Sequence, residues 1–494
     1  MASILGGSAI ARNDYARAFL FPKGVLKCNA TGEFVSCLAV DSLAQDRGDV
    51  TKIECPSPDA YGQFVEVATI PGELSRMTTT LTGRLSRTEV SEFYKLFIDG
   101  CSFDMHLHFG LCDSPEAFNQ FDKALIFENV YVTNFGTDPL VALQSADRAV
   151  INETIDISIG NFYEIVNLKY NQRANAQTIH GGIVTMEICD RKSCGVDCDD
   201  SSSGCDKIFA ASSDFYAYYS DDNGVTWTEQ KIVAVPPVGA TIVDGACWGD
   251  NWVLFDSAAN IWLVDKSDLL SGVGVFEQVA SAISPGLGVA MDTYKGYGVI
   301  VGGAGLIGVF TDPEGGTTIV DAGFAAGANA LNDVTVGEGA SVAVGDAGTV
   351  VYSYDTEIWF ASPTKPTTDN LSAVAVKSKN AWIVGDETGK LWCTDDGGKT
   401  WSRVKYPTWL SNTNPISDIK VASRHVMYMS SGAKLFRSID GGSSWFEEPN
   451  SRLSLPSTIT TLTQIAVCGE DSNFVVVGGT STTATGLVIV GAVA

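Results

Sequence analysis

The hydrophobic pattern of this chain is dominated by short apolar runs that come in pairs. In each pair, a run rich in β-branched residues is followed by a tight turn and a second short run, as in Asn251–Phe255 and Ile261–Val264. Such runs, bounded by turn residues, are typical of antiparallel hairpins. Seven pairs follow one another between residues 207 and 494, with an average period of about 41 residues. They comprise residues 207–219, 251–264, 298–310, 341–352, 381–392, 425–436 and 474–490.

An eight-residue phrase recurs in register with these hairpins. Its last two tryptophans are 44 residues apart, and its first two are 174 apart, or about four periods. The Asp is suited to accept hydrogen bonds from a tight turn, the Gly to supply a positive φ, and the Trp to bury a large apolar face. The candidate structural residues are Ser220, Asp222, Gly224, Thr226 and Trp227; Thr394, Asp396, Gly398, Thr400 and Trp401; and Ser438, Asp440, Gly442, Ser444 and Trp445.

These phrases resemble the Asp-box, or BNR repeat, of sialidases, sortilin-type receptors and photosystem assembly factors. The resemblance implies a turn that supports the fold and carries no chemistry. Degenerate copies follow at 311–316, which has lost its Trp, and at Ser353–Asp355, which keeps only the opening. Four short antiparallel strands in about 40–45 residues make one propeller blade. Residues 207–494 are therefore predicted to form a seven-bladed β-propeller.

Residues 1–182 lack the repeat and are predicted to form a separate β domain. Alternation of apolar and polar residues is clear in Ile151–Ile159. One helix is predicted at 87–97, where apolar residues recur at helical spacing. The expected fold is a β-sandwich or barrel with one packed helix, which makes the whole chain all-β.

This order of elements resembles the tail tube proteins of tailed bacteriophages. The resemblance rests on the strand-into-helix passage 71–87, the central strands and the segment 151–166. It implies a structural virion protein that forms stacked hexameric rings, conducts DNA without holding it, and contacts the tape-measure and other tail proteins. Such a protein is assembled in the host cytoplasm and resides in the virion tail. The propeller is then an outward decoration, with host-surface glycan as a candidate ligand.

The acidic net charge is consistent with a conduit for DNA and excludes a protein that binds nucleic acid stably. The chain has 32 basic and 58 acidic residues, a formal net charge of −26. Stable nucleic-acid binding needs a basic surface that neutralises phosphates. An acidic protein is therefore expected to let DNA pass. No run of 18 apolar residues is present, so no membrane span is expected.

A cysteine-rich joint is predicted at 183–206. Its cysteines, Cys189, Cys194, Cys198 and Cys205, do not show the usual paired spacing of a zinc site. Local disulfides are the favoured interpretation, with free thiols and a bound metal as alternatives. Within this joint, Ile183–Ile188 is a candidate strand for closing the propeller. Deletion of residues 1–190 is expected to leave a folded, monomeric propeller.

No catalytic residue, cofactor or metal is predicted, and the chain is not expected to be an enzyme. Only four arginines follow residue 207, and they cluster in the last repeats instead of forming the spread triad of a sialidase. Asp104, His106 and His108 share one face of a strand, for which a solvent or subunit interface is favoured over a metal. The alternatives are a glycan-binding or glycosidase-like propeller, a capsid decoration protein, or a tail-fibre component.

Overall fold

The structure, a computed structural model, separates the chain into two compact units. The N-terminal unit comprises Met1–Gly24 and Gly32–Asn167, and the propeller unit comprises Val25–Thr31 and Leu168–Ala494. The described residues are 15–22, 28–29, 33–40, 77–86, 100–109, 123–135, 150–172, 179–188, 207–280, 283–284, 287–294, 297–310, 318–319, 329–337, 339–405, 413–468, 474–482 and 485–492.

Strands of the N-terminal unit form one antiparallel sheet in the order β4-β1-β2-β3-β6-β5-β7. An additional pairing joins β4, the first strand of this order, to β5, so six strands form a closed ring and β7 is attached to β5. The strands are β1 (Tyr15–Pro22), β2 (Glu33–Val40), β3 (Met77–Ser86), β4 (Phe103–Phe109), β5 (Lys123–Phe135), β6 (Val150–Ile159) and β7 (Asn161–Val166).

The core of this unit follows from the alternation seen in the sequence. Leu81, Ile155 and Ile157 are buried in one cluster with Met105 and Leu107 of β4. The longest pairing joins β3 to β6 over ten residue pairs, from Met77↔Ile159 to Ser86↔Val150. The expected helix at 87–97 lies outside the described residues.

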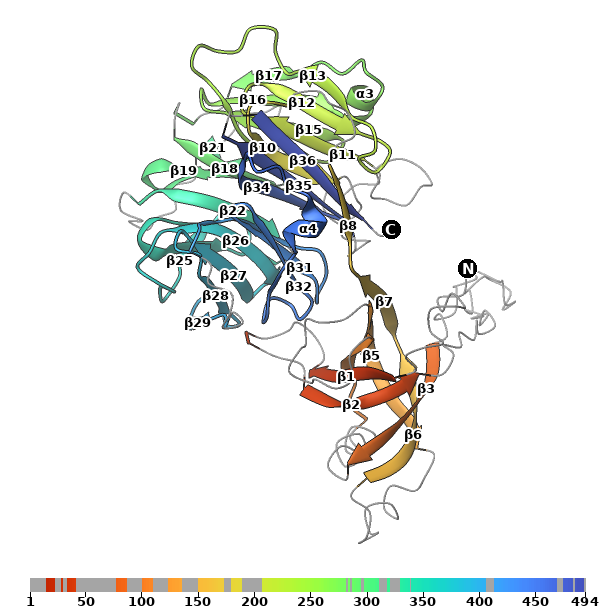
Figure 1. Cartoon of the computed structure of the whole chain (residues 1–494). Helices are drawn as coiled ribbons and strands as arrows, with labels where there is room; N and C mark the ends of the chain where they lie inside the picture. The colour runs from red at the N-terminus through yellow and green to blue at the C-terminus, as the bar shows by residue number, and fades with distance from the viewer. Residues whose placement is uncertain are drawn as a thin grey trace, which may run out of the picture. The chain divides into compact units, whose positions relative to one another are not determined.

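The propeller unit contains seven antiparallel sheets, which confirms the seven-bladed propeller predicted from the repeat (Figure 1). The first three blades are β10 (Ile183–Ile188), β11 (Ile208–Ser212), β12 (Tyr216–Ser220) and β13 (Thr228–Lys231); β14 (Ile242–Trp248), β15 (Asn251–Asp256), β16 (Asn260–Asp265) and β17 (Glu277–Ala280); and β18 (Gly288–Tyr294), β19 (Tyr297–Gly302), β20 (Leu306–Phe310) and β21 (Thr318–Ile319).

The next three blades have the same strand order. They are β22 (Leu331–Gly337), β23 (Ala340–Gly345), β24 (Thr349–Ser353) and β25 (Trp359–Ala361); β26 (Leu371–Ser378), β27 (Ala381–Asp386), β28 (Leu391–Thr394) and β29 (Ser402–Arg403); and β30 (Ile416–Val421), β31 (Met427–Ser431), β32 (Lys434–Ser438) and β33 (Phe446–Glu447). Short helical segments are α3 (Lys266–Leu270), η2 (Gly303–Gly305), η3 (Asp346–Gly348) and α4 (Asn450–Leu453).

The seventh blade is completed by a strand from the other end of the unit. Its strands are β34 (Ile459–Val467), β35 (Val475–Ser481), β36 (Thr485–Ala492) and β8 (Lys169–Gln172), and β9 (Ile179–His180) also pairs with β36. The outermost strand is therefore β8, whereas Ile183–Ile188, the expected closing strand, is the innermost strand of the first blade. Because β8 is short and polar, its sequence has no alternation that would have revealed it.

This arrangement places the division of the chain earlier than the sequence suggested. The sequence pattern predicts a β domain at 1–182, a joint at 183–206 and a propeller at 207–494. In the structure the propeller unit already includes Leu168 and the strands β8, β9 and β10. A deletion ending at residue 190 therefore removes strands of the first and last blades.

Most of the propeller core lies between neighbouring blades. One cluster joins Phe209 of the first blade to Trp252 and Trp262 of the second. Another joins Ile208 of the first blade to Val488 of the seventh, across the point where the ring closes. Apolar surface is thus buried between adjacent sheets, which is how a propeller protects blades that have no core of their own.

Candidate functional site: the inner strands and the turns between blades

Each of the seven inner strands contains a β-bulge in its pairing with the second strand of its blade. A bulge bends its strand and redirects the side chains that follow it. In three blades the residue directly after the bulge is an aspartate, namely Asp244, Asp333 and Asp418. The bulges therefore place carboxylates where the inner strands of two blades meet.

Side chains on the inner strands bind the backbone of an adjacent inner strand at every one of the seven steps around the ring. Carboxylates span four steps: Asp244 Oδ2 accepts from Met291 N (2.9 Å), Asp292 Oδ2 from Val336 N (2.7 Å), Asp333 Oδ2 from Val374 N (2.7 Å), and Asp418 Oδ2 from Ile465 N (2.7 Å). Hydroxyls span three: Thr185 Oγ1 donates to Gly245 O (2.7 Å), Ser372 Oγ to Ile416 O (2.7 Å), and Thr463 Oγ1 to Ile183 O (2.6 Å). The last of these bonds joins the seventh blade to the first.

The environment of these carboxylates raises their pKa. Burial raises the pKa of Asp244 to about 7, although amides of Met291 and Gly245 favour the charged form. Burial also raises the pKa of Asp292, Asp333 and Asp418. Lys420 is the cation of this cluster, and the neighbouring Asp418 raises its pKa despite burial. The ring centre therefore contains carboxyl groups whose charge is costly.

A cavity of about 220 Å³ lies beside this cluster. Its lining includes Glu187, Asp292 and Lys420, together with apolar residues such as Val376 and Ile465. No arginine is among the lining residues. Among the later arginines, Arg437 is buried with its guanidinium 5.6 Å from the ring centre of Tyr428, and Arg452 lies 3.7 Å from Glu448. These two arginines belong to structural contacts of the last two blades.

The eight-residue phrase forms the turn between the third and fourth strands of its blade. In the first copy, Asp222 Oδ1 accepts from Thr226 N (2.8 Å) and Asp222 Oδ2 from Thr226 Oγ1 (2.7 Å). Ser220 Oγ accepts from Gly224 N (2.9 Å), and Trp227 Nε1 donates to Gly224 O (2.8 Å). The five residues thus hold one another in a single turn conformation.

The other two full copies repeat this network. Asp396 accepts from Thr400 N (2.9 Å) and Oγ1 (2.7 Å), and Asp440 accepts from Ser444 N (2.8 Å) and Oγ (2.6 Å). Trp445 Nε1 donates to Gly442 O (3.0 Å), as in the first copy. Trp401 differs, because its Nε1 donates to Thr364 O (3.2 Å) outside the turn. The remaining bonds are Thr394 Oγ1 accepting from Gly398 N (3.0 Å) and Ser438 Oγ accepting from Gly442 N (2.8 Å).

The glycines of these turns lie against the preceding blade. Gly224, Gly398 and Gly442 all have a positive φ. A Cβ at Gly224 would lie 2.5 Å from Val490 Cγ2 of the seventh blade, and one at Gly442 would lie 2.4 Å from Ile383 Cδ1 of the fifth. Glycine is therefore required at each of these positions for two reasons: it adopts the positive φ, and it allows a neighbouring sheet to approach closely.

The fourth blade contains a more complete copy of this turn than its sequence suggested. Ser353 and Asp355 open the turn as expected, with Asp355 accepting from Glu357 N (3.0 Å) and Ile358 N (2.8 Å). Trp359 Nε1 donates to Thr356 O (2.9 Å), so the tryptophan is retained. This copy is one residue shorter than the others, which hid its Trp from a search at fixed spacing. The degenerate copy at 311–316 lies outside the described residues.

Two further aspartates, Asp256 and Asp386, brace the hairpin between the second and third strands of their blades. Asp256 accepts from Asn260 N (2.9 Å) and Trp262 Nε1 (2.9 Å). Asp386 accepts from Lys390 N (2.9 Å) and Trp392 Nε1 (3.2 Å). Both carboxylates are buried. In the second and fifth blades these hydrogen bonds hold the same hairpin turn.

The N-terminal unit contains Asp104, His106 and His108, for which exposure at a solvent or subunit interface was expected. That expectation is wrong, because all three are completely buried on the second face of β4. His106 and His108 lie against Phe21 and Phe19, with ring centres 4.2 and 4.8 Å apart. In the part of the chain that the structure describes, no group of three or more His, Cys, Asp or Glu is arranged to hold a metal ion.

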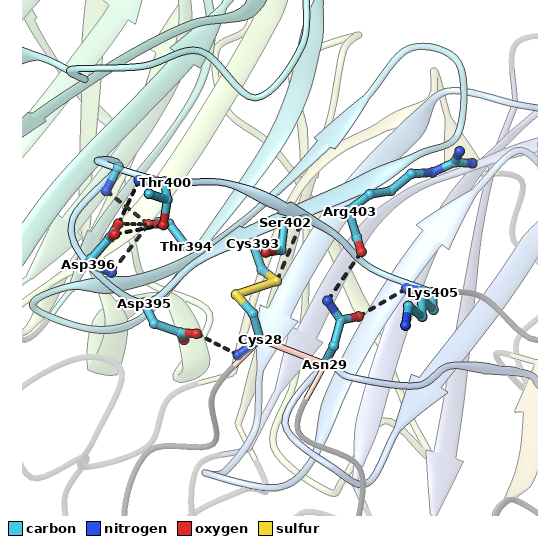
Figure 2. Close-up of a disulfide and its surroundings, with 12 residues drawn as sticks. Cys28, Asn29, Cys393, Thr394, Asp395, Asp396, Thr400, Ser402, Arg403 and Lys405 are labelled. Atoms are coloured by element: carbon cyan, nitrogen blue, oxygen red, sulfur yellow. Dashed lines mark hydrogen bonds between the residues drawn. A yellow bond between two sulfur atoms is a disulfide. The ribbon is translucent and has the colours of Figure 1, made fainter.

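One disulfide attaches a distant segment to the fifth blade. Cys28 is bonded to Cys393 of β28, its backbone N donates to Asp395 Oδ2 (2.7 Å), and Asn29 bonds the backbone of Arg403 and Lys405 (Figure 2). The joint cysteines Cys189, Cys194, Cys198 and Cys205 lie outside the described residues.

The solved structures that resemble this chain share 10–14% of its sequence. The sequence matches no family model and no curated protein. Similar solved structures include YCF48 bound to D1 peptide (14% identity, 67% of this chain and 98% of that chain, TM-score 0.49). They also include YCF48 from Cyanidioschyzon merolae (13%, 66% and 98%, TM-score 0.49) and the RRP9 WD40 repeats (10%, 65% and 97%, TM-score 0.47). None of the described helices is long and apolar enough to cross a membrane.

Proposed function

We propose that the chain is a non-catalytic structural protein of a phage virion, whose N-terminal unit assembles into the stacked rings of a tail tube and whose propeller is displayed as a binding module. The non-catalytic part of the proposal rests on the hydrogen bonds that the aspartates of the inner strands make. Asp244, Asp292, Asp333 and Asp418 each bind an amide of the next blade. A carboxylate held in this way stabilises the ring, and its hydrogen bond occupies an oxygen that a catalytic carboxylate would present to a substrate.

The tail-tube part of the proposal rests on the order of elements in the N-terminal unit. The long antiparallel pairing of β3 with β6 supports it, since the resemblance in sequence rests on these same two segments. The acidic character of the chain also supports it, because a net charge of −26 disfavours retention of DNA. Hexameric rings, the tape-measure protein as a partner, and a location in the virion tail belong to this proposal.

Electron microscopy of the full chain tests the assembly. Purified protein is examined by negative stain over a concentration series, at low and at moderate salt. We expect rings or tubes of one regular width at high concentration. Particles that remain dispersed monomers throughout the series, and also when mixed with preformed tail tips, would contradict the tail-tube proposal. They would leave a capsid decoration, a tail-fibre component or a separate glycan-directed propeller as the alternatives.

A further inference from the structure

A short segment from near the start of the chain is attached to the fifth blade. The segment Val25–Thr31 belongs to the propeller unit, although it lies in sequence between β1 and β2 of the N-terminal unit. Within it, Cys28 is bonded to Cys393 of β28, with 5.8 Å between the two Cα atoms (Figure 2). The two cysteines are 365 positions apart in the sequence, so only the folded propeller brings them together. We call the segment and its contacts the clasp.

The clasp covers an open edge of the fifth blade. The outermost strand β29 pairs with β28, and Val404 N, just after β29, donates to Leu391 O within the blade. Because the backbone groups of successive residues in a strand point to opposite sides, those of Arg403 and Lys405 face away from β28. The Asn29 side chain binds both of them: Nδ2 donates to Arg403 O (3.2 Å), and Oδ1 accepts from Lys405 N (3.2 Å). This amide therefore takes the place of a neighbouring strand.

Two residues of the fifth blade contact the clasp from the turn repeat. Cys393 directly precedes the eight-residue phrase, and Asp395 is the second residue of the phrase. Asp395 Oδ2 accepts from Cys28 N (2.7 Å). The other two full copies of the turn have different pairs at these positions, namely Tyr219 with Asp221 and Arg437 with Ile439. The turn thus forms without this cysteine–aspartate pair, which the contact with Cys28 explains.

The disulfide of the clasp lies where a small thiol can reach it. Cys28 is half-buried, and the hydrogen bonds of Cys28 and Asn29 to the fifth blade are exposed to solvent. The equilibrium between thiols and disulfide depends on how strongly the fold holds Cys28 beside Cys393 when the bond is open. These three hydrogen bonds contribute to that hold, and each contributes little because water competes for the same groups.

We propose that the clasp is a redox-sensitive switch that covers or opens the edge of β29. When it closes, Cys28 Sγ joins Cys393 Sγ, and their two protons and two electrons pass to a small-molecule disulfide, which is reduced to thiols. When a thiol reverses this exchange, the segment leaves the edge, and the backbone groups of Arg403 and Lys405 become accessible. This inference goes beyond the structural function proposed above and does not depend on it.

A redox titration of the full chain tests the switch. The protein is equilibrated at different ratios of reduced to oxidised glutathione, its thiols are alkylated, and each cysteine peptide is quantified by mass spectrometry. We expect Cys28 and Cys393 to change together with one midpoint, while the circular dichroism of the folded protein is retained. Cys247, a buried thiol of the second blade, should stay reduced at every ratio. Different midpoints for Cys28 and Cys393, two thiols that never oxidise, or a bond that opens only on unfolding would overturn the proposal.

Hydrogen exchange measures whether the edge of β29 opens. Amide-resolved exchange is compared between the oxidised chain and the double variant Cys28→Ser, Cys393→Ser, in which the other cysteines are untouched. We expect the Lys405 amide to exchange faster in the variant. The Val404 amide, which donates to Leu391 O inside the blade, should be unchanged. Equal exchange at Lys405 in the two proteins would show that the edge stays covered without the bond, and the switch would be rejected.

Two aspartates at the same position of the turn repeat form a matched pair of substitutions. Asp395→Ala removes the acceptor of Cys28 N and is expected to shift the exchange equilibrium toward the thiols by about 2- to 10-fold. Asp221→Ala removes the same charge from the first copy and should leave the equilibrium unchanged. Equal shifts in the two variants, or no shift in Asp395→Ala, would contradict the positioning of Cys28 on which the proposal rests. None of these measurements requires assembly, so their outcome is independent of the microscopy.

Discussion

At the scale of single residues, the propeller contains carboxyl groups at positions where burial disfavours the ionised form. Asp244 is half-buried, and its two oxygens accept from Gly245 N and from Met291 N of the next blade. Burial raises the pKa of Asp244 to about 7. The two amides and Lys420 lower this pKa, but by less than burial raises it. The folded protein therefore holds a proton at Asp244 over a pH range in which the unfolded chain has lost it.

This difference predicts a pH dependence of stability. The contribution of a raised carboxyl pKa is complete below the pKa of the unfolded chain, about 4, and is lost as the pH rises through about 7. We expect the free energy of unfolding, measured with urea, to fall between pH 5 and pH 8. In Asp244→Asn that fall should be smaller by on the order of 1–2 kcal/mol, below the full linkage value because the side chain is only half-buried.

Asp222→Asn is the matched control for Asp244→Asn. Burial opposes ionisation at Asp222, but hydrogen bonds from Thr226 and Ser220 outweigh it and lower the pKa. A lowered carboxyl pKa contributes stability that is lost only as the pH falls through acidic values. Asp222→Asn should therefore leave the slope between pH 5 and 8 unchanged. Identical slopes in wild type and Asp244→Asn would mean that Asp244 is ionised throughout this range.

At the scale of elements, the turns matter because they pack one blade against another. Gly442 has a φ of +89°, and a Cβ there would lie 2.4 Å from Ile383 Cδ1 of the preceding blade. Gly239 has a φ of +74° but no atom within 4 Å of such a Cβ. The two glycines thus have similar backbone demands and differ in whether another sheet lies beside them.

Alanine at these two positions separates backbone strain from blade packing. Gly239→Ala is expected to cost about 1–2 kcal/mol, the strain of a left-handed conformation. Gly442→Ala should cost that amount and a further 1–3 kcal/mol or so, because the new methyl group forces Ile383 or the sheet to move. Urea denaturation measures both. Equal losses would show that the fifth and sixth blades are not closely packed at this turn.

The same elements show what the sequence reveals and what it conceals. Three full copies of the turn and seven hairpins were predictable, because each is encoded by neighbouring residues with a fixed spacing. The hydrogen bonds of Asp244, Asp333 and Asp418 were not, since each partner lies more than 40 residues away. A polar residue recurring inside apolar strands at roughly the repeat period was the available signal. Trp359 was missed because its turn is one residue shorter.

At the scale of the whole molecule, closure of the ring decides where the chain can be divided. The strand β8 pairs with β36 from Ala492↔Lys169 to Ile489↔Gln172 and completes the seventh blade. The strand β10 is the inner strand of the first blade, and Thr463 Oγ1 bonds to its Ile183 O across the closing step. Both strands lie before residue 190. A fragment that begins after them keeps every full turn repeat and still lacks β8, β9 and β10.

Two truncations are therefore expected to behave differently. Residues 168–494 retain all seven blades, and we expect a monomer that unfolds cooperatively, as measured by circular dichroism and light scattering. Residues 191–494 expose the apolar faces of β11 and β36, and we expect aggregation or loss of cooperative unfolding. Cys393→Ser in both fragments removes the thiol left without Cys28. Equal stability of the two fragments would show that the ring closes without β8 and β10, whereas an oligomeric 168–494 fragment would place assembly contacts on the propeller itself.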